Sequence, residues 1–322
     1  MKHLFFALIM IAFAPLLMSL IARVKAIFAG KVGLPWFFYY HTLLKLLQKT
    51  PVISMHTTAI FTTAPLINLA VMLFLFAFLP LANYRPLLSF YGDIFVVIAF
   101  LALARIFSLL AAFDTASSFS AMGAARDVFY SMLAEIVLFT IFIIFFRLTN
   151  DLSLATFAIE GKIELFARST FFPLLLVAVS FFMLLLQENA RVPIDDPNTH
   201  LELTMIDEVK ILDYSGPYLA FMQLSLFLKL LFYSCFLANL LFSQSLVTQL
   251  CTIALSLDSN SYPLLYAFFK NLIFIALVSA IYIAIAVIES SMARLALKKI
   301  PKYSLSALVL AVLAAILMWR NV

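Results

Sequence analysis

The chain has 322 residues, of which 65% are hydrophobic and 11% are charged, and its formal net charge is +5. Soluble domains contain about 25% charged and about 45–50% apolar residues, so this composition excludes an ordinary soluble protein. Two cysteines cannot supply the four thiolates of an all-cysteine zinc or iron–sulfur site. The small net charge argues against nucleic acid as a partner. We therefore expect an integral membrane protein with the lipid bilayer as its solvent.

Eight apolar segments are long enough to cross a bilayer as helices. A hydrocarbon core of about 30 Å requires about 20 residues of helix, at about 1.5 Å per residue. The sequence shows no repeat and no soluble domain, so it predicts an all-α integral membrane protein with a single polytopic domain over residues 1–322. The expected transmembrane helices cover residues 4–22, 58–79, 93–113, 128–146, 170–187, 217–241, 263–288 and 303–318.

The basic residues between these segments predict the orientation. Only Lys2 precedes the first apolar run, whereas Arg23, Lys25 and Lys31 follow it. This charge order favours a retained membrane anchor with an outside N-terminus over a cleaved signal peptide. More Lys and Arg residues fall in the alternate segments assigned to the cytoplasm than in the opposite ones. We therefore predict that both termini lie outside.

Residues 34–50, between the first two spans, are too polar to cross the membrane and too apolar to lie free in water. Aromatic and leucine side chains recur there at helical spacing, with histidine and lysines on the other face. This pattern predicts an amphipathic helix in the membrane interface, ended by Pro51. Two roles fit it equally: a surface anchor, or a gate beside a cavity, with Trp36 and Tyr40 as the gate residues.

Residues 188–214, between the fifth and sixth spans, form a long acidic loop. Asp196-Pro197 is typical of an N-cap and a first-turn proline, which predicts a short helix through Leu212. Apolar residues alternate with the acids, so we expect part of the loop to be buried, although a solvated loop is the alternative. Buried carboxylates are either paired or raised in pKa until they exchange protons near neutrality. The loop acids are Glu188, Asp195, Asp196, Glu202, Asp207, Glu208 and Asp213.

Four ionisable residues fall well inside the expected spans, and Glu289 lies at the end of the seventh. A charge at a span centre costs about 2.5–3.5 kcal/mol on insertion scales, so we expect these groups to face the bundle interior or a wet cavity. They form either structural ion pairs, with Glu135 bound to Lys229 or Lys270, or a proton relay. The pKa of arginine is too high for proton exchange, so Arg105 fits the structural role better. The four residues are Arg105, Glu135, Lys229 and Lys270.

The acidic loop resembles that of a known family. The run ENARVPIDDP at residues 188–197 resembles the cytoplasmic loop of the H subunit of respiratory complex I, which has a Glu, an Arg-x-Pro and an Asp-x-Pro in this order. Its continuation, THLELTMI at 199–206, is more similar to the branch found in membrane-bound NiFe hydrogenases of the formate hydrogenlyase type. Residues 114–135 and 289–295 also resemble this family, so the resemblance covers nearly the whole chain.

The resemblance implies a non-redox membrane subunit in a bacterial or archaeal cytoplasmic (inner) membrane. Such a subunit joins a peripheral electron-transfer arm on the cytoplasmic side to antiporter-like membrane subunits, and couples redox chemistry to proton or sodium translocation. It implies no cofactor in this chain. Iron–sulfur clusters, with or without a NiFe centre, belong to hydrogenase-like partner subunits, and quinone binding stays open.

The resemblance also assigns roles to individual residues. Glu135 corresponds to the buried glutamate of the family's proton route. Asp207 stands where the hydrogenase branch usually has His, and Asp127 and Asp213 each replace a usual Glu, which keeps acidity but questions any role for imidazole at 207. The expected coupling residues are Glu135, Glu188, Asp195, Glu202, Asp207, Glu208, Asp213, Lys229, Lys270 and Glu289, while Arg126, Asp127, Arg191 and Arg294 are expected to shape the loop or dock the arm.

Two other functions are compatible with the composition. A stand-alone secondary ion transporter is one, although such proteins often contain paired repeats with broken helices, and no such pair is visible. A purely structural anchor for the peripheral arm is the other, and it predicts that the intramembrane charges tolerate neutral replacement.

Overall fold

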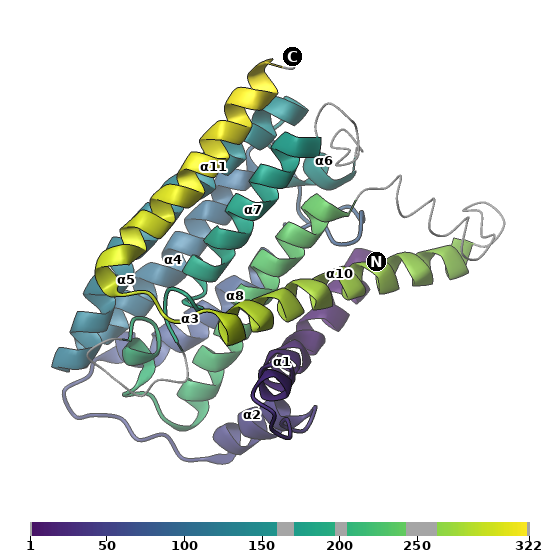
Figure 1. Ribbon diagram of the computed structural model, residues 1–322. Coiled ribbons are helices and arrows are strands. Elements are labelled where there is room, and N and C mark those ends of the chain that lie inside the picture. Colours follow the sequence, from purple (N-terminus) through teal and green to yellow (C-terminus); the bar gives the residue numbers. More distant parts are fainter. Residues whose placement is uncertain (1, 160–170, 197–204, 243–262, 321–322) are drawn as a thin grey trace.

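The computed structural model describes residues 2–159, 171–196, 205–242 and 263–320, and most of these residues are helical (Figure 1). The elements in chain order are α1 (Lys2–Phe28), α2 (Phe38–Gln48), α3 (Ala59–Leu75), α4 (Asp93–Asp114), α5 (Ser118–Thr149), α6 (Leu154–Ile159), α7 (Phe171–Glu188), the 3-10 turn η1 (Glu208–Ile211), α8 (Gly216–Leu241), α10 (Pro263–Ser291), the 3-10 turn η2 (Leu297–Lys299) and α11 (Ile300–Arg320).

Seven of the described helices are long and apolar enough to span a membrane: α1, α4, α5, α7, α8, α10 and α11. The all-α, multi-pass architecture predicted from the sequence is therefore confirmed. A helix lies at each of the eight predicted spans, but the second, α3, has only 17 residues. At about 1.5 Å per residue, α3 falls short of a core of about 30 Å. The count of eight complete spans therefore stays a prediction.

The early end of α3 has a local cause. We expected this span to continue to residue 79, but the α-helix ends at Leu75 and the chain turns. A proline inside a helix clashes with the carbonyl four residues before it. Pro80 therefore disfavours helix around residue 76, and the amide of Ala77 instead bonds the carbonyl of Phe74, three residues earlier.

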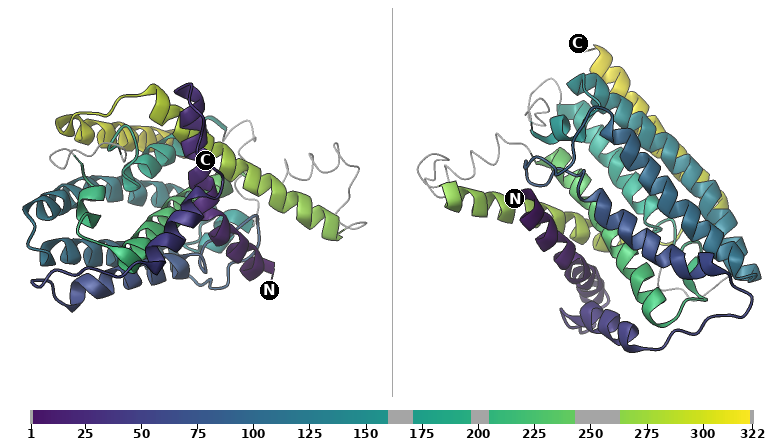
Figure 2. Two further views of the ribbon diagram at one scale, coloured as in Figure 1. Left: turned by 90° about the horizontal axis from the view of Figure 1, so that it is seen from below. Right: turned by 180° about the vertical axis from the view of Figure 1, so that it is seen from behind.

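The helices form an aligned bundle with two tilted neighbours. Helices α4, α5, α7 and α11 run side by side in Figure 1, and both views of Figure 2 show α1 and α10 leaning away from them. The closest packed pairs are α3 with α4, α7 with α11, α3 with α8, and α1 with α10. Helix α8 is the most deeply buried of the seven long helices, so its polar side chains lie inside the protein rather than against lipid.

Contacts between the segments at the helix ends show which of them lie at the same end of the bundle. At one end, Ser215 bonds the amide of Val52, and Tyr130 donates to the carbonyl of Leu297. At the other end, Asp93 accepts the amide of Leu154. In Figure 1, α2 lies at the bottom and the C-terminus at the top. This arrangement is the one expected when successive helices cross the membrane in opposite directions. The assignment of the lower end to the cytoplasm stays a prediction.

The two unusual segments differ in how far the sequence predicted them. A helix does form within residues 34–50, as α2, and none of its side chains is fully buried, although Tyr39 and Leu43 pack partly buried against the core. The predicted helix from Asp196 to Leu212 is wrong over the described residues 205–212, where the chain makes only the 3-10 turn η1. The carboxylate of Asp195 instead accepts the amides of Ile206 and Asp207, which holds the returning chain in an irregular path.

Candidate functional site

Four charged side chains from four helices meet inside the bundle. Arg105 of α4 places Nη2 2.8 Å from Oε2 of Glu188, at the end of α7, and its Nη1 bonds Glu135 of α5. Lys229 of α8 lies 3.2 Å from the same Glu188 oxygen. We call these four residues the deep cluster. The sequence suggested Lys229 or Lys270 as the partner of Glu135, whereas the structure pairs it with Arg105.

A second group lies where η1 packs on α5. Lys210 Nζ is 2.7 Å from Asp127 and 2.5 Å from Asp207. Burial alone would lower the pKa of Lys210, but the two carboxylates raise it above its ordinary value. Burial likewise opposes ionisation of Asp207, but Lys210, Lys229 and Arg105 together more than offset it, so the pKa of Asp207 is lowered. We call Asp127, Asp207 and Lys210 the loop cluster.

A small cavity of about 50 Å³ separates the two clusters. Every charged residue of both clusters except Glu135 lines it. Its remaining polar lining comes from Asn68 of α3, Ser108 of α4 and Ser225 of α8. The two clusters are therefore neighbours across a polar space rather than across packed hydrocarbon.

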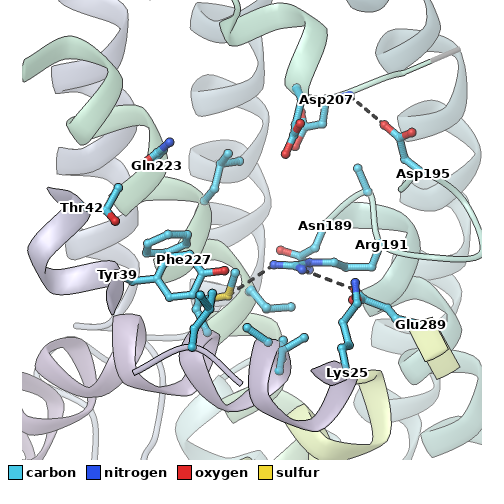
Figure 3. Close-up of a pocket in the computed structure, with 18 of the residues that line it drawn as sticks. Lys25, Tyr39, Thr42, Asn189, Arg191, Asp195, Asp207, Gln223, Phe227 and Glu289 are labelled. Carbon is cyan, nitrogen blue, oxygen red and sulfur yellow. Dashed lines mark hydrogen bonds and ion pairs between the residues drawn. The ribbon is translucent and has the colours of Figure 1, made fainter. Parts of the chain in front are cut away.

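A larger cavity of about 710 Å³ lies beside the loop cluster (Figure 3). Tyr39 and Thr42 of α2 and Phe227 of α8 lie on one side of it, and Asp195 and Asp207 lie on the other. Three residues line both cavities: Asp207, Ile211 and Leu226. Asp207 is the charged one among them, and it lies between the large cavity and the interior of the bundle.

Glu208 also lines the large cavity, and its surroundings make it easy to protonate. Burial, with the nearby carboxylates of Asp195 and Asp207, raises the pKa of Glu208 to about 7. Burial also raises the pKa of Asp195, although the amide of Ile206 and the guanidinium of Arg294, 3.1 Å away, oppose it. Glu208 is thus a carboxylate that can gain or lose a proton near neutral pH.

A third charged group closes one wall of the large cavity. Glu289, at the end of α10, lies 2.8 Å from Lys25 of α1 and 3.4 Å from Arg191, and its side chain is fully buried. Figure 3 shows Arg191 and Lys25 converging on Glu289. These ion pairs tie α1 and α10 to the segment that follows α7.

Other predicted site residues lie apart from the two clusters. Lys270 lies at the opposite end, with Nζ 4.5 Å from the ring centre of Tyr84. Asp213 accepts a 2.8 Å hydrogen bond from Ser120, and Arg126 donates to the carbonyl of Met205 at 3.1 Å. Glu202 lies outside the described residues.

The proposed gate residues occupy different surroundings from those expected. Trp36 stacks on Arg23, with 4.1 Å between the guanidinium carbon and the ring centre, and the Tyr40 hydroxyl donates to the carbonyl of Ala12. Among the described residues of α2, those lining the large cavity are Tyr39 and Thr42. Neither Trp36 nor Tyr40 lines the large cavity.

Sequence reasoning missed several polar residues of the site. Lys210 was not among the expected coupling residues, and Lys25 served only as an orientation signal. Asn68 carried a usable signal, because an amide in an apolar span is costly unless it has a partner. Its distant partner on α4, Ser108, is visible only in the folded chain.

Comparison with known proteins decides the family. A family model described as NADH dehydrogenase matches residues 1–320. The chain belongs to this family. Formate hydrogenlyase subunit 4 of Escherichia coli (strain K12) is 25% identical over 223 residues, which cover 69% of this chain and 71% of that protein. The resemblance found in the acidic loop is thereby confirmed.

The NADH dehydrogenase family fold also matches a solved structure. A chain of the membrane-bound sulfane sulfur reductase (MBS), described as an archaeal respiratory membrane complex, superposes with a TM-score of 0.78 at 17% identity. The match covers 98% of this chain and 99% of that one, so the two share a fold over their whole lengths. Within the described residues, no group of three or more His, Cys, Asp and Glu side chains could hold a metal ion.

Proposed function

We propose that this NADH dehydrogenase family chain is the membrane subunit of a complex-I-like, hydrogenase-type oxidoreductase in a prokaryotic inner membrane. It anchors a peripheral electron-transfer arm and couples the redox chemistry of that arm to ion translocation. The iron–sulfur clusters, and any NiFe centre, belong to the partner subunits. Similarity to a formate hydrogenlyase subunit, and a fold shared with a chain of an archaeal respiratory complex, support this assignment.

The observation that carries the proposal is the placement of Asp207 between the two cavities. On its large-cavity side lies Glu208, and on its small-cavity side lie Glu188 and Lys229 of the deep cluster. From Glu188 the ion pairs continue through Arg105 to Glu135. A proton entering at Glu208 therefore has a series of titratable groups to follow into the membrane.

Glu208 is the group most sensitive to the redox state of a neighbouring arm. An electron that arrives on the arm adds negative charge, which raises the pKa of a nearby carboxyl. A carboxyl with a pKa of about 7 is half protonated at neutral pH, so a small shift changes its occupancy. Glu208 would take up a proton when the arm is reduced and release it when the arm is reoxidised, and this cycle would drive one proton along the series.

Arg105 fixes how the two carboxylates of the deep cluster are arranged. Its guanidinium stays protonated, so it cannot carry a proton itself. By pairing with both Glu135 and Glu188 it holds two carboxylates at one depth, and Lys229 supplies the exchangeable ammonium beside Glu188. When a proton moves between these groups, a different carboxylate becomes the neutral one, and each remaining charge still has an oppositely charged partner.

The test is Glu135→Gln in the intact complex, reconstituted in sealed vesicles, with electron transfer and proton translocation measured separately. The variant should keep its electron transfer and lose proton translocation, because glutamine fills the same volume but cannot ionise. Thr140→Val, five residues along α5, is the matched control, since the Thr140 hydroxyl bonds its own helix at Ile136. Proton translocation at the unmodified level in Glu135→Gln would refute the relay, and loss of assembly would favour a structural ion pair.

A further inference from the structure

Asn68 is a buried polar residue that the route described above does not use. It lies on α3, is 3% exposed and lines the small cavity between the two clusters. Its Nδ2 donates to Ser108 Oγ at 2.8 Å and lies 3.4 Å from Met222 Sδ. Both amide hydrogens therefore have acceptors.

The orientation of the Asn68 amide follows from Ser108. The Ser108 hydroxyl donates its one hydrogen to the carbonyl of Ala104, at 2.9 Å, so its oxygen can only accept from Asn68. This places Nδ2 against Ser108 and leaves Oδ1 as the free end of the amide. Oδ1 is buried and receives no hydrogen bond from the described residues.

An unsatisfied buried carbonyl oxygen is costly, and a water molecule is the usual way to satisfy it. A cavity of about 50 Å³ has room for water, which takes up about 30 Å³ per molecule in the liquid. The ammonium groups of Lys210 and Lys229 on its walls offer such a water further partners.

The charges on the cavity walls bear on which ion can pass. Three carboxylates line it, from Asp127, Glu188 and Asp207, and three cations line it, from Arg105, Lys210 and Lys229. Each carboxylate is already in an ion pair with one of these cations. A sodium ion would bring a fourth positive charge into a buried site that has no carboxylate left for it. A proton that is passed along through water needs no unpaired carboxylate.

We propose that Asn68 Oδ1 anchors ordered water in the small cavity, and that this water passes protons, not sodium ions, between the loop cluster and the deep cluster. The water accepts a proton from the loop cluster as it gives one to the Glu188–Lys229 pair, so its own composition is unchanged. This inference rests on the proposed function, to which it adds the carrier and the ion.

The test uses three variants of the intact complex in sealed vesicles. Asn68→Leu keeps the volume and removes the acceptor, so the ratio of protons translocated to electrons transferred should fall at least about tenfold. Asn68→Ser restores an oxygen that accepts from water, and should recover most of the ratio. Ser225→Ala is the matched control at the same cavity, because the Ser225 hydroxyl is already bonded to the carbonyl of Met222 and its loss should change little.

Two direct measurements accompany the variants. A high-resolution map of the unmodified complex should show water density within hydrogen-bond distance of Asn68 Oδ1, and ²²Na⁺ uptake by the vesicles should be absent. A dry cavity, sodium uptake coupled to electron transfer, or an unchanged ratio in Asn68→Leu would each overturn the inference. If Glu135→Gln loses translocation while Asn68→Leu keeps it, the water site fails and the proposed function survives. If Glu135→Gln keeps it, the proposed function fails.

Discussion

Glu208 is a residue whose protonation state changes near physiological pH. Its pKa is about 7, raised by burial and by Asp195 and Asp207, so it is protonated below that pH and ionised above it. The raised pKa means that folding favours the protonated form. Its contribution to stability is therefore complete below the unfolded pKa of about 4.3 and is lost as the pH rises through about 7.

Glu208→Gln should remove this pH dependence. Glutamine mimics the protonated side chain at every pH but cannot exchange a proton, so proton translocation should be lost, and thermal stability should vary less between pH 5 and 8. Translocation and thermal unfolding of the complex measured across that range provide the check. Translocation that persists in Glu208→Gln would assign the entry of the proton to another residue.

The Glu289 ion pairs predict a different kind of effect, on stability rather than on transport. Glu289→Gln would leave Lys25 and Arg191 beside each other without a buried counter-charge. Breaking a buried ion pair by removing one partner costs about 3–5 kcal/mol. Because the Lys25 side chain is 25% exposed, we expect the lower part of that range.

The measurement is the thermal unfolding midpoint of the solubilised complex, with Lys25→Met as the control. That control leaves Glu289 paired with Arg191 and should be milder. Equal or smaller destabilisation by Glu289→Gln than by Lys25→Met would show that the charge group does not hold α1 and α10 to the loop.

At the residue scale, the sequence predicted which side chains are charged groups inside apolar spans, but not which of them contact one another. A charge in an apolar span is visible by its cost, and this picked out Arg105, Glu135 and Lys229. Helical spacing gives the face of one helix only, so it could not show that Glu135 faces Arg105 on α4. The junction role of Asp207 depends on an irregular chain path that no periodic pattern encodes.

At the scale of elements, the contact between η1 and α5 places the loop cluster. Gly123 of α5 makes this approach possible. A Cβ added at Gly123 would lie 3.1 Å from Val209 Cβ and 3.2 Å from the carbonyl oxygen of Ile206. These distances are tighter than ordinary contacts, and the second neighbour is backbone, which cannot rotate away.

Gly123→Ala should therefore push η1 from α5 and move Asp207 and Lys210 relative to Asp127. We expect proton translocation to fall about tenfold while the bundle still assembles, because overpacking costs typically about 1–3 kcal/mol, which is less than unfolding requires. Ala124→Gly, at the next position on α5, is the control for the change in helix propensity. Unchanged translocation in Gly123→Ala would show that the spacing of the loop cluster is not critical.

Elements that depend on the hydropathy of a whole segment were predicted better than elements that depend on single residues. Hydropathy over about 20 residues placed the long helices well, because burial in lipid is a property of the whole segment. The end of α3 and the turn η1 depend on single groups, such as Pro80 and the Asp195 carboxylate, which redirect a few backbone hydrogen bonds. Over the described residues 205–212, such local competition outweighed the helix that the Asp196-Pro197 pattern predicted.

At the scale of the whole molecule, the tilt of α1 and α10 makes room for the large cavity. Both helices lean from the aligned bundle in Figure 2, and their lower ends contribute Lys25 and Glu289 to the cavity wall. The most charged loop of the chain forms the opposite wall. The carboxylates of the proposed relay that line this cavity therefore lie at the end that the sequence assigns to the cytoplasm, where the proposed arm would bind.

The isolated chain also leaves an intramembrane charge incompletely covered. The Glu135 side chain is 36% exposed, although it lies on the long apolar helix α5. Facing lipid with such a group costs about 2.5–3.5 kcal/mol on insertion scales for comparable charged residues. A neighbouring membrane subunit that covers α4 and α5 would remove this cost.

We therefore expect the chain to purify in mild detergent as part of a multi-subunit assembly. Light scattering should give a mass well above the 36.2 kDa of one chain, and elemental analysis should find iron, with or without nickel, in the same fractions. Stripping the partners with harsh detergent should leave a chain that aggregates, because the Glu135 surface is then uncovered. A stable monomer that transports ions in vesicles by itself would contradict both the exposed-charge argument and the proposed function, and would establish a secondary transporter instead.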